Sequence, residues 1–126
     1  MGRSRMIIVV DDEPDILQYI GEILRHVNYE VITATSGDEA WILFEEHQPE
    51  IDMVLTDVVM PGFIDGLELA AKIHQIDPSL PVLFVTGALP EGDARAVGIV
   101  EKELLVRKPF SPKQLIDLVK ARIRRF

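Results

Sequence analysis

The 126-residue sequence contains no cysteine, which excludes disulfide bridges, thiolate metal sites and cysteine nucleophiles. No apolar run approaches the roughly 20 residues of a membrane-spanning helix, and the first residues lack the pattern of a secretory signal. Acidic residues outnumber basic ones, 21 to 13, which gives a net charge of −8. Such a chain repels nucleic acid and anionic membranes, so neither is expected as a partner. The absence of cysteine fits a cytoplasmic location.

What is present is the composition of an ordinary globular protein, with 48% hydrophobic and 27% charged residues. A chain of this length forms one domain with a substantial core. We therefore expect a single domain over residues 1–126, in which residues 1–5 are disordered or foreign to the natural chain.

Five short apolar or β-branched runs recur at fairly even intervals and predict strands. They cover residues 6–10, 30–34, 52–56, 81–86 and 104–107. The first, third and fourth runs are almost continuously apolar. This indicates strands that are covered on both faces, as in a parallel sheet.

Segments with helical periodicity separate these strands. Capping boxes, a proline in a first turn and an Asp-Gly pair predict four helix starts, at Ser36, Ser111, Pro14 and Asp65. The helix after Asp65 is expected to bury Leu67, Ala70, Ala71 and Ile73. Proline and glycine interrupt residues 89–100, so a helix there is expected to be short or mobile. A βα unit repeated five times predicts an α/β fold, a three-layer (βα)5 sandwich with helices on both faces of a parallel sheet.

Polar side chains follow four of the predicted strands. Asp11-Asp12-Glu13 follows the first, Asp57 the third and Lys108 the fifth, while Thr86 ends the fourth. Each residue alone has an ordinary explanation, such as helix capping or a loop charge. Ligands of open α/β sheets bind beyond the carboxyl ends of the strands, where the fold brings all these residues together. Together they predict a functional site.

Three clustered acids require a cation. Two carboxylates about 4 Å apart repel by roughly 4 kcal/mol at an effective dielectric of 20, and Lys108 offsets only one charge. Oxygen ligands without nearby histidine or cysteine favour Mg²⁺ or Mn²⁺, which can also hold a phosphoryl oxygen. Asp57 stands alone at a central strand end, so we expect it to be the nucleophile that forms an aspartyl phosphate.

Taken in order, the motifs resemble the receiver domain of two-component response regulators over essentially the whole chain. They are Asp11-Asp12-Glu13-Pro14, Thr56-Asp57-Val58-Val59-Met60-Pro61-Gly62, Asp65-Gly66, Thr86-Gly87 and Lys108-Pro109-Phe110. The resemblance implies a flavodoxin-like fold with a five-stranded parallel sheet of order 2-1-3-4-5. It also implies that a histidine kinase or histidine phosphotransfer protein donates the phosphoryl group, and that phosphorylation controls an output domain or protein.

The resemblance assigns roles to individual residues. The side chains expected to act on the phosphoryl group are those of Asp57, as phosphoacceptor, Thr86 and Lys108. The expected Mg²⁺ ligands are the carboxylates of Asp11, Asp12 and Asp57 and the backbone carbonyl of Val59. The peptide bond before Pro109 is expected to be cis. A domain of this kind catalyses its own phosphorylation and slow dephosphorylation, and it is not expected to be a turnover enzyme.

Three features depart from the common pattern of the family. Phe63-Ile64 makes the loop after Asp57 one residue longer than usual. Leu105 replaces the aromatic residue three positions before the lysine, which leaves the form of the output switch open. The interrupted fourth helix belongs to the usual partner face, with the fifth strand and fifth helix, through which a homodimer could form. The longer loop and the residues around Lys108 look most like receivers of hybrid histidine kinases.

Two apolar residues bear on the lifetime of the phosphorylated state. Val59 and Ala88 flank the phosphoryl position in the family pattern. Neither side chain can orient an attacking water molecule. The sequence therefore predicts a comparatively long-lived aspartyl phosphate.

Other functions remain open on the same fold. An interaction module that is never phosphorylated is compatible with Leu105, although the complete set of polar residues argues against it. A haloacid-dehalogenase-like phosphatase needs two acids separated by one residue, whereas Asp11 and Asp12 are adjacent. A nucleotide-binding role lacks a glycine-rich phosphate loop.

Overall fold

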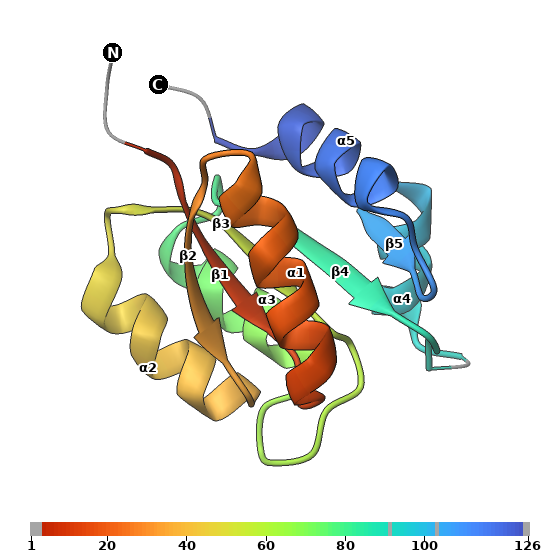
Figure 1. Cartoon of the computed structure of the whole chain (residues 1–126). Coiled ribbons are helices and arrows are strands. Elements are labelled where there is room, and N and C mark those ends of the chain that lie inside the picture. The colour runs from red at the N-terminus through yellow and green to blue at the C-terminus, as the bar shows by residue number, and fades with distance from the viewer. Residues whose placement is uncertain (1–3, 91, 103, 125–126) are drawn as a thin grey trace.

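Strands and helices alternate along the whole chain (Figure 1). The structure is a computed structural model that describes residues 4–90, 92–102 and 104–124. In these residues the elements are β1 (Met6–Val10), α1 (Pro14–His26), β2 (Glu30–Ala34), α2 (Gly37–His47), β3 (Ile51–Thr56), α3 (Gly66–Ile76), β4 (Val82–Thr86), α4 (Ala94–Glu101), β5 (Leu105–Arg107) and α5 (Pro112–Arg122). The strands form one parallel sheet of order β2-β1-β3-β4-β5, which confirms the expected flavodoxin-like fold.

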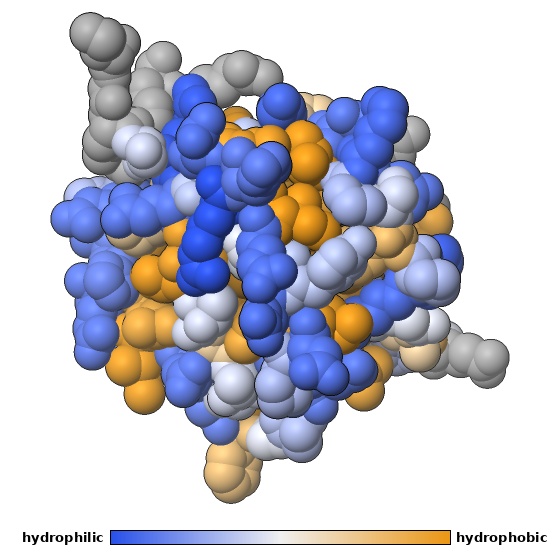
Figure 2. All heavy atoms as spheres, viewed as in Figure 1, coloured by the Kyte–Doolittle hydropathy of each residue, from blue (hydrophilic) through white to orange (hydrophobic). Residues whose placement is uncertain are grey.

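Both faces of the sheet are covered. Met6, Ile8 and Val10 of β1 pack with residues of α2, α3 and α4, whereas Ile7 and Val9 pack with α1 and α5. Figure 1 shows the same three layers, and Figure 2 shows polar side chains over α1 with apolar ones visible along its flanks. Because successive side chains of a strand point to opposite faces, two cores require the nearly continuous apolar runs seen in the sequence.

Several element boundaries differ from the expected ones by one residue. β3 begins earlier, at Ile51, while β4 and β5 begin later, at Val82 and Leu105. Pro81 has no N–H to donate to a strand ladder. The N–H of Leu104 instead donates to the carbonyl of Ile99 at the end of α4, 3.1 Å away. The fourth helix has eight residues, as its glycine and proline content predicted.

The two predicted capping boxes have different outcomes. At Ser111 the box is complete, because Ser111 and Gln114 each accept the other's backbone N–H. Ser36 accepts from the N–H of Glu39, but the Glu39 carboxylate accepts from Thr35 instead of Ser36. The φ angle, which sets the direction of an N–H, is −153° at Ser36 and −88° at Ser111. The predicted hydrogen bond from the Ser36 N–H to the Glu39 carboxylate was therefore wrong.

Helix α3 begins as predicted and buries a slightly different face. The side chain of its N-cap, Asp65, accepts from the N–H of Glu68 at 2.8 Å. The buried residues include Leu67, Ala70 and Ile73 as expected, and also Leu69. Ala71 is exposed, so its assignment to the inner face was wrong.

The first and last described segments are tied to the amino end of the sheet. The carbonyl of Arg5 accepts from the N–H of Glu30, and its Nε donates to the carbonyl of Arg124 at 3.0 Å. Residues 1–3, part of the segment expected to be disordered or foreign, lie outside the described residues. No helix within the described ranges is both long and apolar enough to span a bilayer.

An ion pair joins the residues just after α5 to the turn after α3 at this end. The guanidinium of Arg124 donates to the carboxylate of Asp77, and both side chains are partly buried. Burial opposes the charge of Asp77, but the hydrogen bonds from Arg124 and Ser79 prevail and hold its pKa below the ordinary value of 3.8. The pair therefore stabilises the fold only while Asp77 is ionised.

Replacing Asp77 with asparagine tests this pair. Asp77→Asn should lower the free energy of unfolding at pH 7 by about 1 kcal/mol, because the amide keeps an oxygen for Ser79 but loses the charge. A depressed carboxyl pKa contributes stability above pH 3.8 that is lost as the pH falls through the folded-state value. The difference between variant and wild type in urea unfolding should therefore shrink below about pH 4. Asp117→Asn, in an exposed pair with Lys113, is the control and should have little effect.

Candidate functional site

The predicted site residues meet at the carboxyl edge of the sheet. Backbone hydrogen bonds continue past the strand ends and fix their relative positions. The N–H of Asp57 donates to the carbonyl of Val10 at 3.0 Å, and that of Lys108 donates to the carbonyl of Thr86 at 2.9 Å. The residues that follow β1, β3 and β5 are therefore held side by side with the last residue of β4.

Three carboxylates cluster at this edge. Asp11, Asp12 and Asp57 each offer an oxygen, and these oxygens all lie within 4.8 Å of one another. Asp11 is 1% exposed and Asp57 6% exposed, while Asp12 is half-buried. Asp11 and Asp57 are thus almost completely buried, and Asp12 is the acid of the cluster nearest to solvent.

One ammonium group bridges two of these acids. The Nζ of Lys108 lies 2.9 Å from Oδ2 of Asp11 and 2.9 Å from Oδ2 of Asp57, with Glu13 farther away at 3.8 Å. Burial by itself lowers the pKa of Lys108, but the hydrogen bonds to Asp57 and Asp11 outweigh it and raise that pKa. Burial raises the pKa of Asp11 against the hydrogen bonds from Glu13 and Lys108 that lower it. Lys108 is therefore a permanent cation, and burial makes Asp11 harder to ionise.

The charges of the pocket do not balance. Among the described residues, three carboxylates oppose one ammonium group, which contacts two of them. Like charges no more than 4.8 Å apart repel by at least about 3.5 kcal/mol at an effective dielectric of 20. A compact all-oxygen set with one partly exposed acid fits Mg²⁺, which takes one or two carboxylates and keeps other positions for water or phosphate. Mn²⁺ accepts the same ligands. Asp11, Asp12 and Asp57 can thus hold such an ion, whereas the Val59 carbonyl as a ligand stays a prediction.

The carboxylate of Asp57 is fixed in orientation. Its Oδ1 accepts from the N–H of Val58 at 2.6 Å, and its Oδ2 accepts from Lys108. The hydroxyl of Thr56 donates to the Asp57 carbonyl at 2.9 Å. A Cβ on Gly66 would lie 1.9 Å from that same carbonyl, so only glycine fits there. Sequence reasoning missed the Thr56 hydrogen bond and the close approach of Gly66, because Gly66 was interpreted as a helix start and as part of a family motif, without a packing role.

Thr86 is buried at the end of β4, and its hydroxyl is engaged locally. It donates to the carbonyl of Ala88 at 2.9 Å. The Lys108–Pro109 peptide bond is cis, as the resemblance implied. Val59 is 57% exposed, and Ala88 is exposed as well. Because both side chains are apolar, neither brings a polar group to the site.

Comparison with known proteins agrees with this geometry. The sequence model of the family described as "Response regulator receiver domain" matches residues 7–120. This chain belongs to that family. The receiver domain is 37% identical over 125 residues to the probable transcriptional regulator ycf27 of Porphyra purpurea, covering 98% of this chain and 49% of the relative. The chain spans about half or less of the length of the curated relatives it matches.

Solved structures are also similar to this receiver domain. A response regulator receiver domain protein from Clostridium thermocellum superposes with a TM-score of 0.80 at 33% identity, covering 93% of this chain and 92% of that one. The receiver domain from the hybrid histidine kinase CckA gives a TM-score of 0.76 at 33% identity, covering 93% and 97% of the two chains. Both are similar to this chain in fold and in sequence.

Replacing Asp12 tests the charge imbalance. Asp12→Asn should raise the free energy of unfolding in metal-free buffer by on the order of 1 kcal/mol, because it removes repulsion that solvent only partly screens. Added Mg²⁺ should raise the melting temperature of the wild type and leave that of the variant nearly unchanged. Thermal and urea unfolding with EDTA or Mg²⁺ measure both effects. Glu45→Gln, on the exposed surface of α2, serves as the charge-matched control, and an equal response of the two variants would contradict the interpretation.

Proposed function

We propose that this receiver domain accepts a phosphoryl group on Asp57 from a phosphohistidine of a histidine kinase or histidine phosphotransfer protein. The observation that carries the proposal is the recessed Asp57 carboxylate, 2.9 Å from the Lys108 ammonium group, inside a cluster with surplus negative charge. Such a pocket suits a transferred group whose oxygens need cations around them. Family membership supports the same function.

The chemical step is a displacement at phosphorus. A carboxylate oxygen of Asp57 forms the new P–O bond, while the P–N bond to the donor imidazole breaks and its electron pair stays on the ring nitrogen. Bound Mg²⁺, held by Asp11, Asp12 and Asp57, would supply positive charge to the phosphoryl oxygens. Lys108, already bonded to Asp57, can move its ammonium group to a phosphoryl oxygen. The domain thereby catalyses its own modification and is not a turnover enzyme.

Phosphorylation would change the bonding of Thr86. Its hydroxyl now donates to the Ala88 carbonyl, and a phosphoryl oxygen on Asp57 offers a charged acceptor that makes a stronger hydrogen bond. We infer that Thr86 turns from one acceptor to the other and releases the Ala88 carbonyl. The segment between β4 and α4 is then free to rearrange, which shifts the domain between two states.

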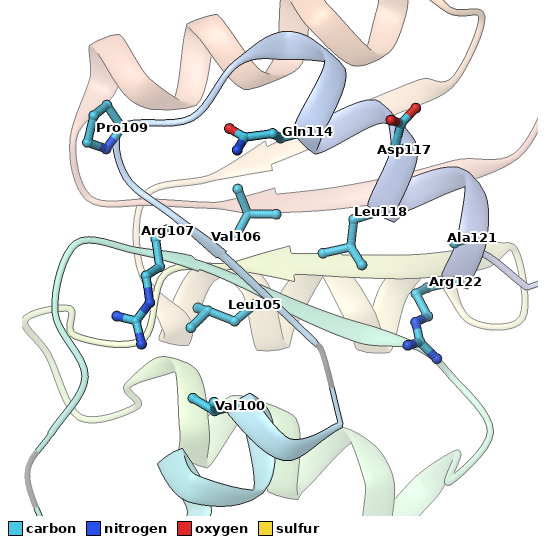
Figure 3. A pocket seen from close by; sticks show the side chains of 10 residues that line it. All are labelled: Val100, Leu105, Val106, Arg107, Pro109, Gln114, Asp117, Leu118, Ala121 and Arg122. Carbon is cyan, nitrogen blue, oxygen red and sulfur yellow. The ribbon is translucent and has the colours of Figure 1, made fainter.

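The output surface proposed here is the face formed by α4, β5 and α5. It contains a cavity of about 770 Å³, around which Val100, Leu105 and Leu118 lie, with Arg107 and Arg122 at its sides (Figure 3). Leu105 pairs in register with Phe84, and Arg107 with Thr86, the last residue of β4, so movement at the end of β4 reaches this face. A flexible aliphatic side chain there can repack where relatives use an aromatic ring. An output partner or a second copy of the chain would bind this face.

The cellular setting is part of the same proposal. A cytoplasmic location agrees with the cysteine-free sequence. The similarity to the receiver domain of CckA supports a place in a relay that starts from a hybrid histidine kinase. An unphosphorylated interaction module is the second candidate, favoured by Leu105, and an aspartyl-phosphate phosphatase is disfavoured by the adjacent acids.

Intact-mass spectrometry after treatment with acetyl phosphate tests the phosphoacceptor. The wild type should gain one phosphoryl group in Mg²⁺ and none in EDTA, and Asp57→Asn should gain none under either condition. Glu45→Gln should behave as the wild type does. An adduct of undiminished yield in Asp57→Asn would place the phosphoryl group on another residue and contradict the proposal. An unmodified wild type would favour the interaction module instead.

Replacing Val59 tests the lifetime of the phosphorylated state. Val59→Asn places an amide beside the phosphoryl position, where it can orient a water molecule, so loss of phosphate should accelerate several-fold. Decay of the phosphorylated mass species after removal of acetyl phosphate gives the rate. Val97→Asn, at a similarly exposed apolar position on α4, should leave that rate unchanged. Identical decay in wild type and Val59→Asn would contradict the prediction.

A further inference from the structure

Phe63 has an unusual position for a phenylalanine. Its side chain is 92% exposed, the largest value for any large apolar residue that the structure describes. Phe44 and Phe84 are buried in the core, and Phe110 is half-buried. An isolated exposed apolar residue is common on protein surfaces, so the significance of Phe63 depends on how it is held and on what lies beside it.

The loop holds Phe63 away from the core. Met60 is buried and Ile64 packs against the core beneath α2 and α3, so the chain is anchored on both sides of the turn. Gly62 has a φ of +109°, which lets the chain reverse between these anchors. The backbone of Ile64 also lies against Gly37, where a Cβ would be 2.1 Å from the Ile64 carbonyl. The backbone is thus held in place on both sides of Phe63.

The same loop closes directly on Asp57. The N–H of Gly66 donates to the carbonyl of Val58 at 2.9 Å, and Gly66 also touches the Asp57 carbonyl. Phe63 is three residues from Gly66, so their Cα atoms lie within about 11 Å of each other. Figure 1 shows the yellow-green loop between β3 and α3 reaching beyond the carboxyl end of the sheet. Val59, 57% exposed, adds an apolar side chain to the same loop.

The burial of Asp57 limits how a phosphohistidine can reach it. The carboxylate is 6% exposed, and transfer requires the reacting atoms to approach to about 3–3.5 Å. A protein whose histidine enters this pocket must bring its own surface onto the surrounding loops. A small donor such as acetyl phosphate enters without touching them. Any role of Phe63 in docking will therefore distinguish protein donors from small ones.

We propose that Phe63 is an anchor that inserts into an apolar socket beside the phosphohistidine of the donor protein. The inference rests on the proposed function and deepens it by naming a specificity-determining contact. Aromatic residues at the centre of interfaces carry much of the binding energy, because they bury a large rigid area. Asp38 lies beside the turn, 3.4 Å from the Cβ position of Gly62, so the donor's socket should be bordered by cationic residues.

Phosphotransfer measured with two kinds of donor tests the proposal. The rate of phosphorylation is measured for wild type, Phe63→Ser and Ile76→Ser with each donor. The small donor is acetyl phosphate. The protein donor is chosen from a panel of purified, ³²P-labelled histidine kinases and histidine phosphotransfer proteins as the one that labels the wild type fastest. Ile76 is the matched control, since it is 50% exposed and ends α3 at the opposite edge of the sheet. The rate from the protein donor should fall about tenfold or more in Phe63→Ser only. Rates from acetyl phosphate should agree within about twofold, and Phe63→Trp should recover part of the protein-dependent rate.

Each other outcome has a definite meaning. Equal protein-dependent rates in Phe63→Ser and wild type would overturn the proposal, and so would the absence of labelling by every protein while acetyl phosphate reacts. Slower reaction of Phe63→Ser with both donors would assign Phe63 to the shape of the acid pocket, again overturning a docking role. A wild-type dimer in sedimentation that Phe63→Ser abolishes, with phosphotransfer unchanged, would assign the residue to a second copy of the chain. Failure of acetyl phosphate on the wild type would instead refute the proposed function itself.

Discussion

Repulsion among carboxylates at the edge of the sheet is the constraint on which the rest of the site depends. Three acids share a small recess, and the ammonium group of Lys108 touches two of them. This ion-pair bridge reduces the repulsion among the acids, but negative charge remains in excess. A protein selected only for stability would not keep such a cluster, so the cost indicates a function that uses it.

The parallel sheet makes this arrangement available. Its strands all end at one edge, and backbone hydrogen bonds between neighbouring strands continue to Asp57 and Lys108. The two cores on either face leave the chain little freedom to move these ends apart. Glycine at position 66 then allows the loop after Asp57 to return close to its own carbonyl. The sheet and its two cores thus fix the positions of the charges, and loops surround them.

Much of this could be predicted from the sequence because strands have direction. Once residues 6–10 and 52–56 were identified as parallel strands, Asp11 and Asp57 had to lie at the same edge of the sheet. The resemblance to receiver domains supplied the strand order, and the family comparison confirms it. Contacts that depend on three-dimensional packing could not be predicted in the same way. The pair between Arg124 and Asp77 joins residues 47 positions apart. The incomplete box at Ser36 differs from the complete one at Ser111 in the backbone angle of its N-cap residue.

The hydrogen bond from Thr86 to the carbonyl of Ala88 sets how large a stimulus the domain needs. A neutral bond of this kind contributes about 1 kcal/mol net, and Ala88 is exposed, so water can replace the hydroxyl at its carbonyl with little loss. An energy of this size corresponds to only about a fivefold preference between two side-chain orientations. The resting orientation of Thr86 is thus a shallow minimum, and one additional charged acceptor nearby is enough to reverse the preference.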